Sequence, residues 1–381
     1  MRTIYFDYNA TTPLDPKIRE IVLPYLDEVF GNPSSIHHVG QRARALLDDA
    51  RDRLARVWHC KPSEIVFTSG GTESNNLAIF GTARRFGQQG RHLITSPTEH
   101  RCVLHCFEYL EKKEGFEVTY LPVNGEGIVE ADALEQAIRP DTILASIMAA
   151  NNETGTIQQV AQLGKICRAH GVVFHTDAVQ WFGKEPFSDI GQFNADLVSV
   201  CAHKYHGLKG TGALFIRSPL LPDPILFGGG HEHDRRAGTE NLLGIIALVE
   251  ATERFITSPV FSKEKLLPLR ARLVRLVESI PGAEVHGARS SHLNNTVCFT
   301  VAGCDSTTLL AGLDLEGICA SSGSACSAGS LNPSHVLKAM GLDDQQSGSL
   351  IRFSLGRDST LAEVENVEQI LPSIIRRSRR S

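Results

Sequence analysis

The regular alternation of short apolar segments with helical segments between residues 63 and 217 is the strongest constraint on the fold. Seven segments are short and apolar, as buried strands are. They cover residues 64–68, 92–95, 117–120, 143–146, 172–175, 197–200 and 212–216. Helical stretches lie between them, among them residues 74–86, 102–113 and 160–169. This alternation predicts an α/β fold with a mainly parallel seven-stranded sheet flanked by helices.

The pattern changes to α+β after Pro259, and a chain of 381 residues is long enough for two domains. We expect residues 15–258 to form the large domain. Residues 1–14 and 259–381 would form a smaller α+β domain, with a helix at 263–280 and strands near 295–301 and 349–354. Residues 226–241, rich in Gly, His and charge, are expected to form a long functional loop.

Composition excludes several classes of function. The net charge of −5 argues against a nucleic-acid-binding surface, and no apolar run approaches the roughly 20 residues that cross a membrane. The first residues lack a signal-peptide pattern, so a cytoplasmic protein is expected. Nine scattered cysteines without a CxxC pair do not suggest disulfides or zinc. Cys102 and Cys106 could share a helix face, but without a second ligand pair we expect no metal site.

Lys204 directly follows the predicted strand 197–200, in the segment CAHKYHGLKG. Ligands of α/β sheets bind outside the carboxyl ends of the strands, so this is a place for chemistry. The neighbouring His203 and His206 would disfavour a protonated ammonium, and a neutral amine can form a Schiff base. Taken alone, Lys204 is better explained as a surface lysine in a polar turn.

Four other predicted strand ends offer groups that suit pyridoxal phosphate. Asp177 could keep a proton on a pyridine nitrogen, which makes that ring an electron sink. The glycine turn at residues 69–74 opens a helix whose free N–H groups could hold a phosphate. His100 could stack on an aromatic ring, and amides at residues 151–152 could bond a phenolic oxygen. No GxxxxGK[ST] motif for a nucleotide is present.

Cys326 lies in the segment SSGSACSAGS, residues 321–330, among small residues that cannot build a core. A thiol in such a loop is presented for reaction, whereas a cysteine in a core is inert. A Gly/Ser loop that happens to contain a cysteine is the alternative reading.

Taken together, the motifs TSGGTESNN, TEH, NNETG, HK, RRAGTEN and SSGSAC resemble those of the NifS/IscS-like cysteine desulfurases. These are pyridoxal 5'-phosphate enzymes of the class-V aminotransferase family, with the fold type I. The resemblance covers essentially the whole chain. It implies a homodimer that converts L-cysteine to L-alanine and transfers sulfur to an acceptor protein, either an iron–sulfur scaffold or a thiolation protein.

The resemblance also implies roles for individual residues. Lys204 would form the Schiff base, Cys326 would take the sulfur as a persulfide, and His100 would stack on the ring and carry a proton. Asp177 would contact the pyridine nitrogen of the cofactor, and Gln180 its phenolic oxygen. The residues implied around the phosphate are Gly71, Thr72, Cys201, His203 and, from the other subunit, Thr239. Asn152 and Arg352 would bind the substrate, Arg352 by clamping its carboxylate.

This chain departs from the family pattern at Cys201, where relatives commonly have a hydroxyl, since a thiol is a weaker donor. Leu208 replaces a usual proline and Thr154 a usual isoleucine. A selenocysteine lyase would share every cofactor residue, an aminotransferase would be indifferent to Cys326, and a non-catalytic sulfur carrier would bind no cofactor. The sequence leaves the sulfur acceptor open.

Overall fold

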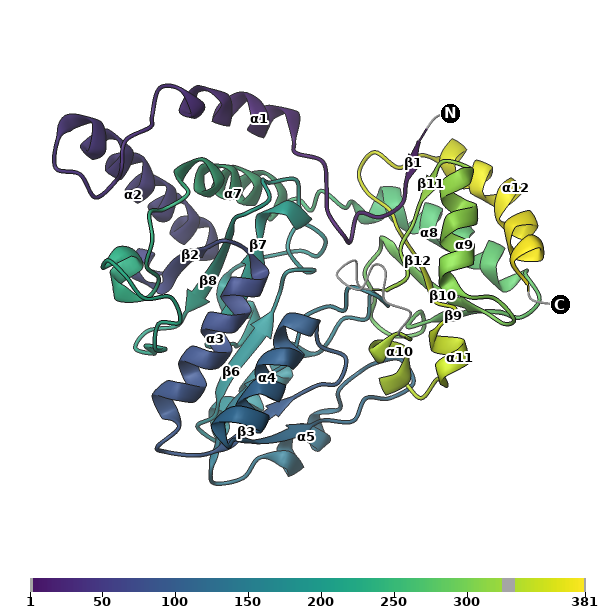
Figure 1. The fold of residues 1–381 in the computed structure, drawn as a ribbon, viewed down its shortest axis with the longest axis horizontal. Coiled ribbons are helices and arrows are strands. Elements are labelled where there is room, and N and C mark those ends of the chain that lie inside the picture. Colours follow the sequence, from purple (N-terminus) through teal and green to yellow (C-terminus); the bar gives the residue numbers. More distant parts are fainter. Residues whose placement is uncertain (1–2, 324–332, 380–381) are drawn as a thin grey trace.

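The computed structural model describes residues 3–323 and 333–379, which form a large α/β lobe and a smaller lobe (Figure 1). The sheet of the large lobe has seven strands in the order β2-β8-β7-β6-β5-β3-β4. The strands are β2 (Ile65–Thr68), β3 (His92–Thr95), β4 (Glu117–Tyr120), β5 (Thr142–Ser146), β6 (Val173–Asp177), β7 (Leu197–Cys201) and β8 (Gly212–Ile216).

The sheet is mainly parallel, and only β8 runs antiparallel to its neighbours, β2 and β7. All seven strands predicted from the sequence are present, so the predicted fold class is confirmed. Three of them, β3, β4 and β8, have the predicted bounds, and the other four differ at one or both ends by one or two residues. The difference matters at β6, because Asp177 is the last residue of that strand rather than a residue of the loop after it.

Helices cover both faces of the sheet because successive side chains of a strand point to opposite faces. On β2, Ile65 and Phe67 join a cluster with α2 (His38–Trp58), α6 (Val160–Ala169) and α7 (Leu242–Phe255). Val66 points the other way and packs with Leu77 of α3 (Gly71–Phe86). The helix α4 (Arg101–Glu114) packs beside α3, and the short helices α1 (Pro16–Val22) and α5 (Ala131–Ala137) complete the lobe.

The small lobe is built on an antiparallel sheet of β12 (Ile351–Ser354), β10 (Thr296–Val301) and β9 (Ala283–His286). Its helices are α8 (Lys263–Glu278), α9 (Ser306–Leu315), α10 (His335–Ala339), α11 (Asp344–Ser347) and α12 (Leu361–Ser378). The N-terminal strand β1 (Ile4–Tyr5) joins this lobe by pairing in parallel with β11 (Ile318–Cys319) (Figure 1). Ile4 and Phe6 share a core cluster with Leu273 and Phe353. The domain boundaries after residues 14 and 258 stay a prediction from the sequence.

Within the two described ranges, no helix is long and apolar enough to cross a membrane.

Candidate active site

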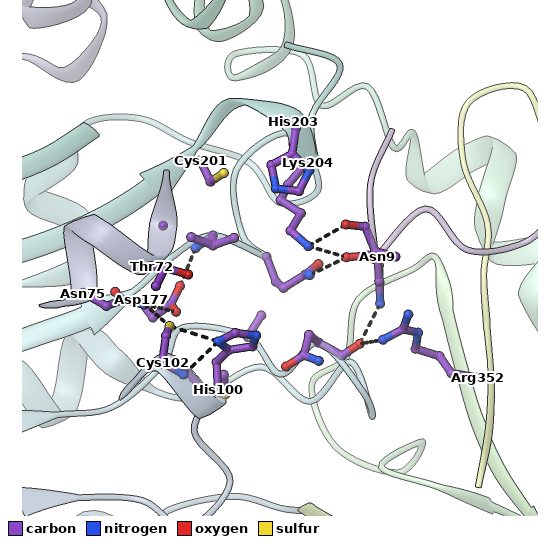
Figure 2. Close-up of a pocket in the computed structure, with 17 residues that line it drawn as sticks. Asn9, Thr72, Asn75, His100, Cys102, Asp177, Cys201, His203, Lys204 and Arg352 are labelled. Atoms are coloured by element: carbon purple, nitrogen blue, oxygen red, sulfur yellow. Dashed lines mark hydrogen bonds between the residues drawn. The ribbon is translucent and has the colours of Figure 1, made fainter. Parts of the chain in front are cut away.

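A cavity lies where the carboxyl ends of β2, β3, β5, β6 and β7 meet, at the edge of the sheet that faces the small lobe. It encloses about 760 Å³ of atom-free space, part of it open to solvent. The predicted site residues that line it are Gly71, Thr72, His100, Asn152, Asp177, Gln180, Cys201, His203, Lys204 and Arg352. Figure 2 shows Asp177 and Thr72 towards one end, Arg352 at the other, and Lys204 and His100 on opposite walls between them.

Lys204 ends a 3-10 turn, Ala202–Lys204, which directly follows β7. Its Nζ donates to the main-chain oxygens of Asn9 and Ala10, both at 2.8 Å (Figure 2). Residues 9 and 10 belong to the N-terminal segment, so this segment forms the wall opposite the sheet. The turn after the strand therefore directs the amine into the cavity.

The two imidazoles beside Lys204 are neutral at pH 7. Burial lowers the pKa of His203 to about 4 and that of His206 to about 4. His203 Nδ1 pairs with Thr11 Oγ1 at 3.0 Å, and His206 Nδ1 with the Pro13 carbonyl at 2.8 Å. These contacts tie the turn to the N-terminal segment, and the imidazoles add no positive charge beside Lys204.

Asp177 stands at the end of β6 with its carboxylate held in place. Its Oδ1 accepts from the Val179 N–H at 2.9 Å and its Oδ2 from Asn75 Nδ2 at 2.7 Å. The side chain is 6 % exposed, so these two bonds offset part of the cost of burying the charge. A carboxylate fixed in this way can hold a proton on a ring nitrogen.

The glycine turn before α3 presents a helix N-terminus to the cavity. Gly70 has φ +152° and ψ −177°, which only glycine adopts readily, and it provides no side-chain cap. A Cβ at Gly71 would lie 2.7 Å from Val179 Cγ2, so a side chain does not fit there. The N–H groups of the first turn are the usual binding site for phosphate, and Thr72 and Cys201 line the same region.

His100 is the N-cap of α4, and this fixes its ring. Nδ1 accepts from the Cys102 N–H at 3.2 Å and lies 2.9 Å from Cys102 Sγ. Burial is the main reason that the pKa of His100 is lowered, so the ring is neutral. With Nδ1 as an acceptor, the ring proton is on Nε2.

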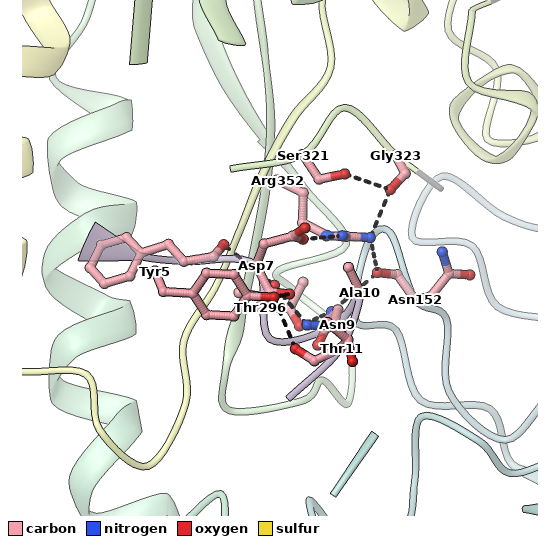
Figure 3. Close-up of polar contacts among 12 residues, drawn as sticks. Tyr5, Asp7, Asn9, Ala10, Thr11, Asn152, Thr296, Ser321, Gly323 and Arg352 are labelled. Atoms are coloured by element: carbon pink, nitrogen blue, oxygen red, sulfur yellow. Dashed lines mark hydrogen bonds and ion pairs between the residues drawn. The ribbon is translucent and has the colours of Figure 1, made fainter. Parts of the chain in front are cut away.

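Arg352, on β12, is 1 % exposed and already bonded at both ends of its guanidinium (Figure 3). Nη1 donates to the carbonyls of Asn152, at 2.9 Å, and Gly323, at 2.7 Å. Nη2 donates to Asp7 Oδ1 at 2.6 Å. Nε is buried without a hydrogen-bond partner among the residues that the structure describes. Arg352 thus joins the N-terminal segment, the loop after β5 and the small lobe.

Two predicted site residues are not part of this cavity as described. Thr239 is exposed and lines a second hollow, together with Arg44, Glu232 and Glu240. Cys326 lies outside the described residues, so its role stays a prediction from the sequence.

The sequence analysis missed Asn9 and Asn75. Asn9 is 1 % exposed and contacts Lys204, Gln180 and Asn152. Asn75 orients the Asp177 carboxylate. A signal existed for Asn75, because it lies four residues after Gly71 and therefore on the same face of α3. No local pattern distinguishes Asn9.

The donor set fits pyridoxal phosphate. An uncapped helix N-terminus beside Thr72 suits its phosphate, the Asp177 carboxylate suits its ring nitrogen, and the Gln180 amide suits its phenolic oxygen. The amine of Lys204 lies between these groups, in the same cavity. Among the described residues no cluster of His, Cys, Asp and Glu could hold a metal ion.

Glu99, next to His100, is fully buried and is expected to make stability depend on pH. Its Oε1 accepts from the Met148 N–H at 2.7 Å, and Oε2 has no partner within the described part of the chain. Burial raises the pKa of Glu99 well above 4.5. Above pH 4.5 the unfolded chain therefore loses a proton that the folded protein keeps, and the free energy of unfolding falls as pH rises.

The Glu99→Gln variant keeps the bond from Met148 and removes this titration. We expect its free energy of unfolding to exceed that of the parent by about 1–2 kcal/mol at pH 7, and to differ little at pH 4. Urea unfolding at both pH values measures the two differences. Equal differences at pH 4 and pH 7 would contradict the assignment.

Comparisons with known proteins identify the family of this chain. The family model described as aminotransferase class-V matches residues 4–367. A protein named cysteine desulfurase IscS from Dictyoglomus turgidum is 45% identical over 379 residues, covering 99% of this chain and 96% of that protein. Another protein of that name, from Methanosarcina thermophila, is 45% identical over 378 residues, which cover 99% of this chain and 93% of that protein. A solved structure named NifS-like protein superimposes with a TM-score of 0.91 at 36% identity, and the match covers 98% of this chain and 100% of that one. The chain belongs to the class-V aminotransferase family.

Proposed function

We infer that the protein is a pyridoxal-phosphate-dependent cysteine desulfurase, which converts L-cysteine to L-alanine and transfers the sulfur to an enzyme cysteine as a persulfide. The observation that carries this inference is the shared cavity of Lys204, Asp177 and Arg352, in a chain closely similar to proteins named cysteine desulfurase. The persulfide sulfur would then pass to an acceptor protein for iron–sulfur cluster assembly or thiolation.

The cofactor would be held by the residues described above. Lys204 would bind its aldehyde carbon, Asp177 its ring nitrogen, and the first turn of α3 with Thr72 and His203 its phosphate. His100 would stack on the ring. When bound, the cofactor supplies an electron sink for the charge left at the substrate Cα after proton removal.

The remaining chemistry belongs to side chains of this protein. The Lys204 amine would take the Cα proton of the substrate, and His100 would hold a proton on Nε2 near the substrate sulfur. The Cys326 thiolate would attack that sulfur, so that an S–S bond forms as the C–S bond breaks. L-cysteine thereby becomes L-alanine, and Cys326 carries the transferred sulfur as a persulfide.

Arg352 is proposed to bind the substrate carboxylate. Its Nε provides an unused donor, whereas its Nη groups are bonded to Asn152, Gly323 and Asp7. A bidentate contact would therefore use Nε together with Nη2 and would compete with the Asp7 carboxylate. Asn152 would help to orient the bound amino acid.

The test is to reconstitute the purified full chain with pyridoxal phosphate and supply L-cysteine with a thiol reductant. We expect alanine and sulfide in equal amounts, measured by amino-acid analysis and a sulfide assay. Selenocysteine is the comparison substrate, and alanine formed only from selenocysteine would contradict the assignment. Alanine that appears only when a 2-oxo acid is added would indicate an aminotransferase instead.

We also propose that the active form is a homodimer in which Thr239 reaches the partner's phosphate site. Exposed apolar side chains lie on two segments. The first carries Leu26 (58% exposed), Phe30 (79%) and Ile36 (90%), and the second carries Phe227 (81%). The hollow that contains Thr239 is lined by Asn32 and Ser34 of one segment and by residues 229–233, 239 and 240 of the other, so the two segments adjoin. A second copy of the chain would cover this apolar surface.

Replacing Phe30 with glutamate is expected to shift the protein from dimer to monomer in sedimentation velocity and to weaken cofactor retention. Leu315, which is 78% exposed on the small lobe, is the matched control. The Leu315→Glu variant should remain a dimer. A monomeric parent protein, or a Phe30→Glu variant that stays dimeric with normal cofactor retention, would contradict the proposal.

A further inference from the structure

Lys184 is a buried lysine that the proposed reaction does not use. It is 3% exposed, and its Nζ donates to Asn9 Oδ1 at 2.7 Å and to Gln180 Oε1. The Phe261 ring lies 5.2 Å from Nζ. These partners within the described structure are amide oxygens rather than a carboxylate. Burial, with the charges of Lys204 and Arg352, lowers the pKa of Lys184 well below its usual value. Placing an amine here costs stability.

The contacts with Lys184 and with the Asn9 carbonyl decide which end of the Gln180 amide faces the cavity. A primary amide has an oxygen that only accepts and a nitrogen that only donates, at positions of nearly equal size. In the structure the Lys184 amine donates to the Gln180 oxygen, which therefore faces it. Gln180 Nε2 then donates one proton to the Asn9 carbonyl at 2.9 Å. Its second N–H is left for the cavity, which Gln180 lines.

Lys184 orients Asn9 in the same way. Asn9 Oδ1 accepts from Lys184, which leaves Nδ2 to donate to Thr296 Oγ1 at 2.9 Å and to the Asn152 carbonyl at 3.1 Å (Figure 3). The main-chain oxygen of Asn9 accepts from both Gln180 and Lys204. One amine thus contacts two side-chain amides: that of Asn9, which donates to the Asn152 carbonyl, and that of Gln180, which lines the cavity.

We propose that Lys184 is a positioning residue, whose amine holds the Gln180 amide with Nε2 towards the phenolic oxygen of the cofactor. This rests on the proposed function, since it requires pyridoxal phosphate in the cavity. A phenolate is stabilised by an N–H donor and destabilised by a carbonyl oxygen. Without Lys184, only the Asn9 carbonyl still orients the Gln180 amide, and the anionic form of the cofactor has a less firmly held donor.

The Lys184→Met variant tests this in the full reconstituted protein, because methionine is unbranched like lysine but has no donor. The readout is the pH at which the visible absorbance of the bound cofactor changes. We expect this midpoint to rise by about one pH unit, as expected when an anion loses a hydrogen bond. Gln180→Met should raise the midpoint by a similar amount. The double variant should show no further rise, because both changes remove the same bond.

Controls separate this role from general stabilisation. Leu273→Ala removes a fully buried side chain from the small lobe, so it should lower the melting temperature and leave the midpoint unchanged. Lys184→Gln keeps an N–H donor and should keep a midpoint close to that of the parent. The Lys184→Gln variant also provides the test if the methionine variant does not fold. If its midpoint rises as much as that of Gln180→Met, the positioning role of Lys184 is contradicted.

The outcomes also distinguish this inference from the proposed function. A parent protein that takes up no pyridoxal phosphate overturns both. A parent that binds the cofactor and releases alanine, with an unshifted Lys184→Met midpoint, overturns only the role of Lys184. Shifts of Lys184→Met and Gln180→Met that add fully in the double variant also overturn it, because independent effects do not arise from one shared hydrogen bond.

Discussion

Replacing Lys204 with alanine is expected to lower alanine formation from cysteine by at least about a thousandfold, because one amine would serve both as the cofactor's covalent anchor and as the base for the Cα proton. The variant should also lose the cofactor label that borohydride reduction fixes on the parent protein. Mass spectrometry of the reduced protein measures this second effect independently of activity.

Lys209→Ala is the matched control, because Lys209 is an exposed lysine five residues further along the same segment. It should retain both activity and the borohydride-fixed label. If the Lys204→Ala protein still carries the label, another lysine anchors the cofactor, and the assignment is wrong. Lys184 is the nearby alternative, and peptide mapping of the labelled protein would identify it.

Replacing Cys326 with alanine is expected to have the second largest effect, a loss of at least about a hundredfold in sulfide release from cysteine. The physical reason is that a thiolate must accept the sulfur as the C–S bond breaks. Cofactor absorbance and the borohydride label should stay at parent levels, because Lys204 and its surroundings are unchanged. A persulfide-selective alkylating reagent followed by mass spectrometry should find the extra sulfur on Cys326 of the parent.

Cys60→Ala provides the control for this experiment. Cys60 is partly buried, burial raises the pKa of its thiol to about 12, and it should have little thiolate at neutral pH. That variant should keep full activity. A Cys326→Ala protein that releases sulfide at the parent rate would refute the nucleophile assignment. Retained turnover of selenocysteine alone would favour a selenocysteine lyase.

The strands were predictable because their signal is local. Each of the seven is a short apolar segment, and each is present within two residues of its expected position. The helix α1 also has a local signal in the pair Asp15-Pro16: Asp15 accepts from the Lys17 N–H at 2.9 Å, and Pro16 opens the helix. The substrate end of the site was less predictable, because the contacts of Arg352 with Asp7, Asn152 and Gly323 have no signal in the sequence.

The sequence by itself determined which residues end the strands, and thereby brought Asp177, His100 and Lys204 to one edge of the sheet. The reason is that parallel strands place their carboxyl ends together, whatever the rest of the fold does. Only the tertiary structure decided how these groups are oriented. Lys204 and Asn9 are 195 residues apart, and their contact depends on the N-terminal segment packing across the cavity. The direction of the Gln180 amide likewise depends on its contact with the buried Lys184 amine, which forms only when the chain is packed.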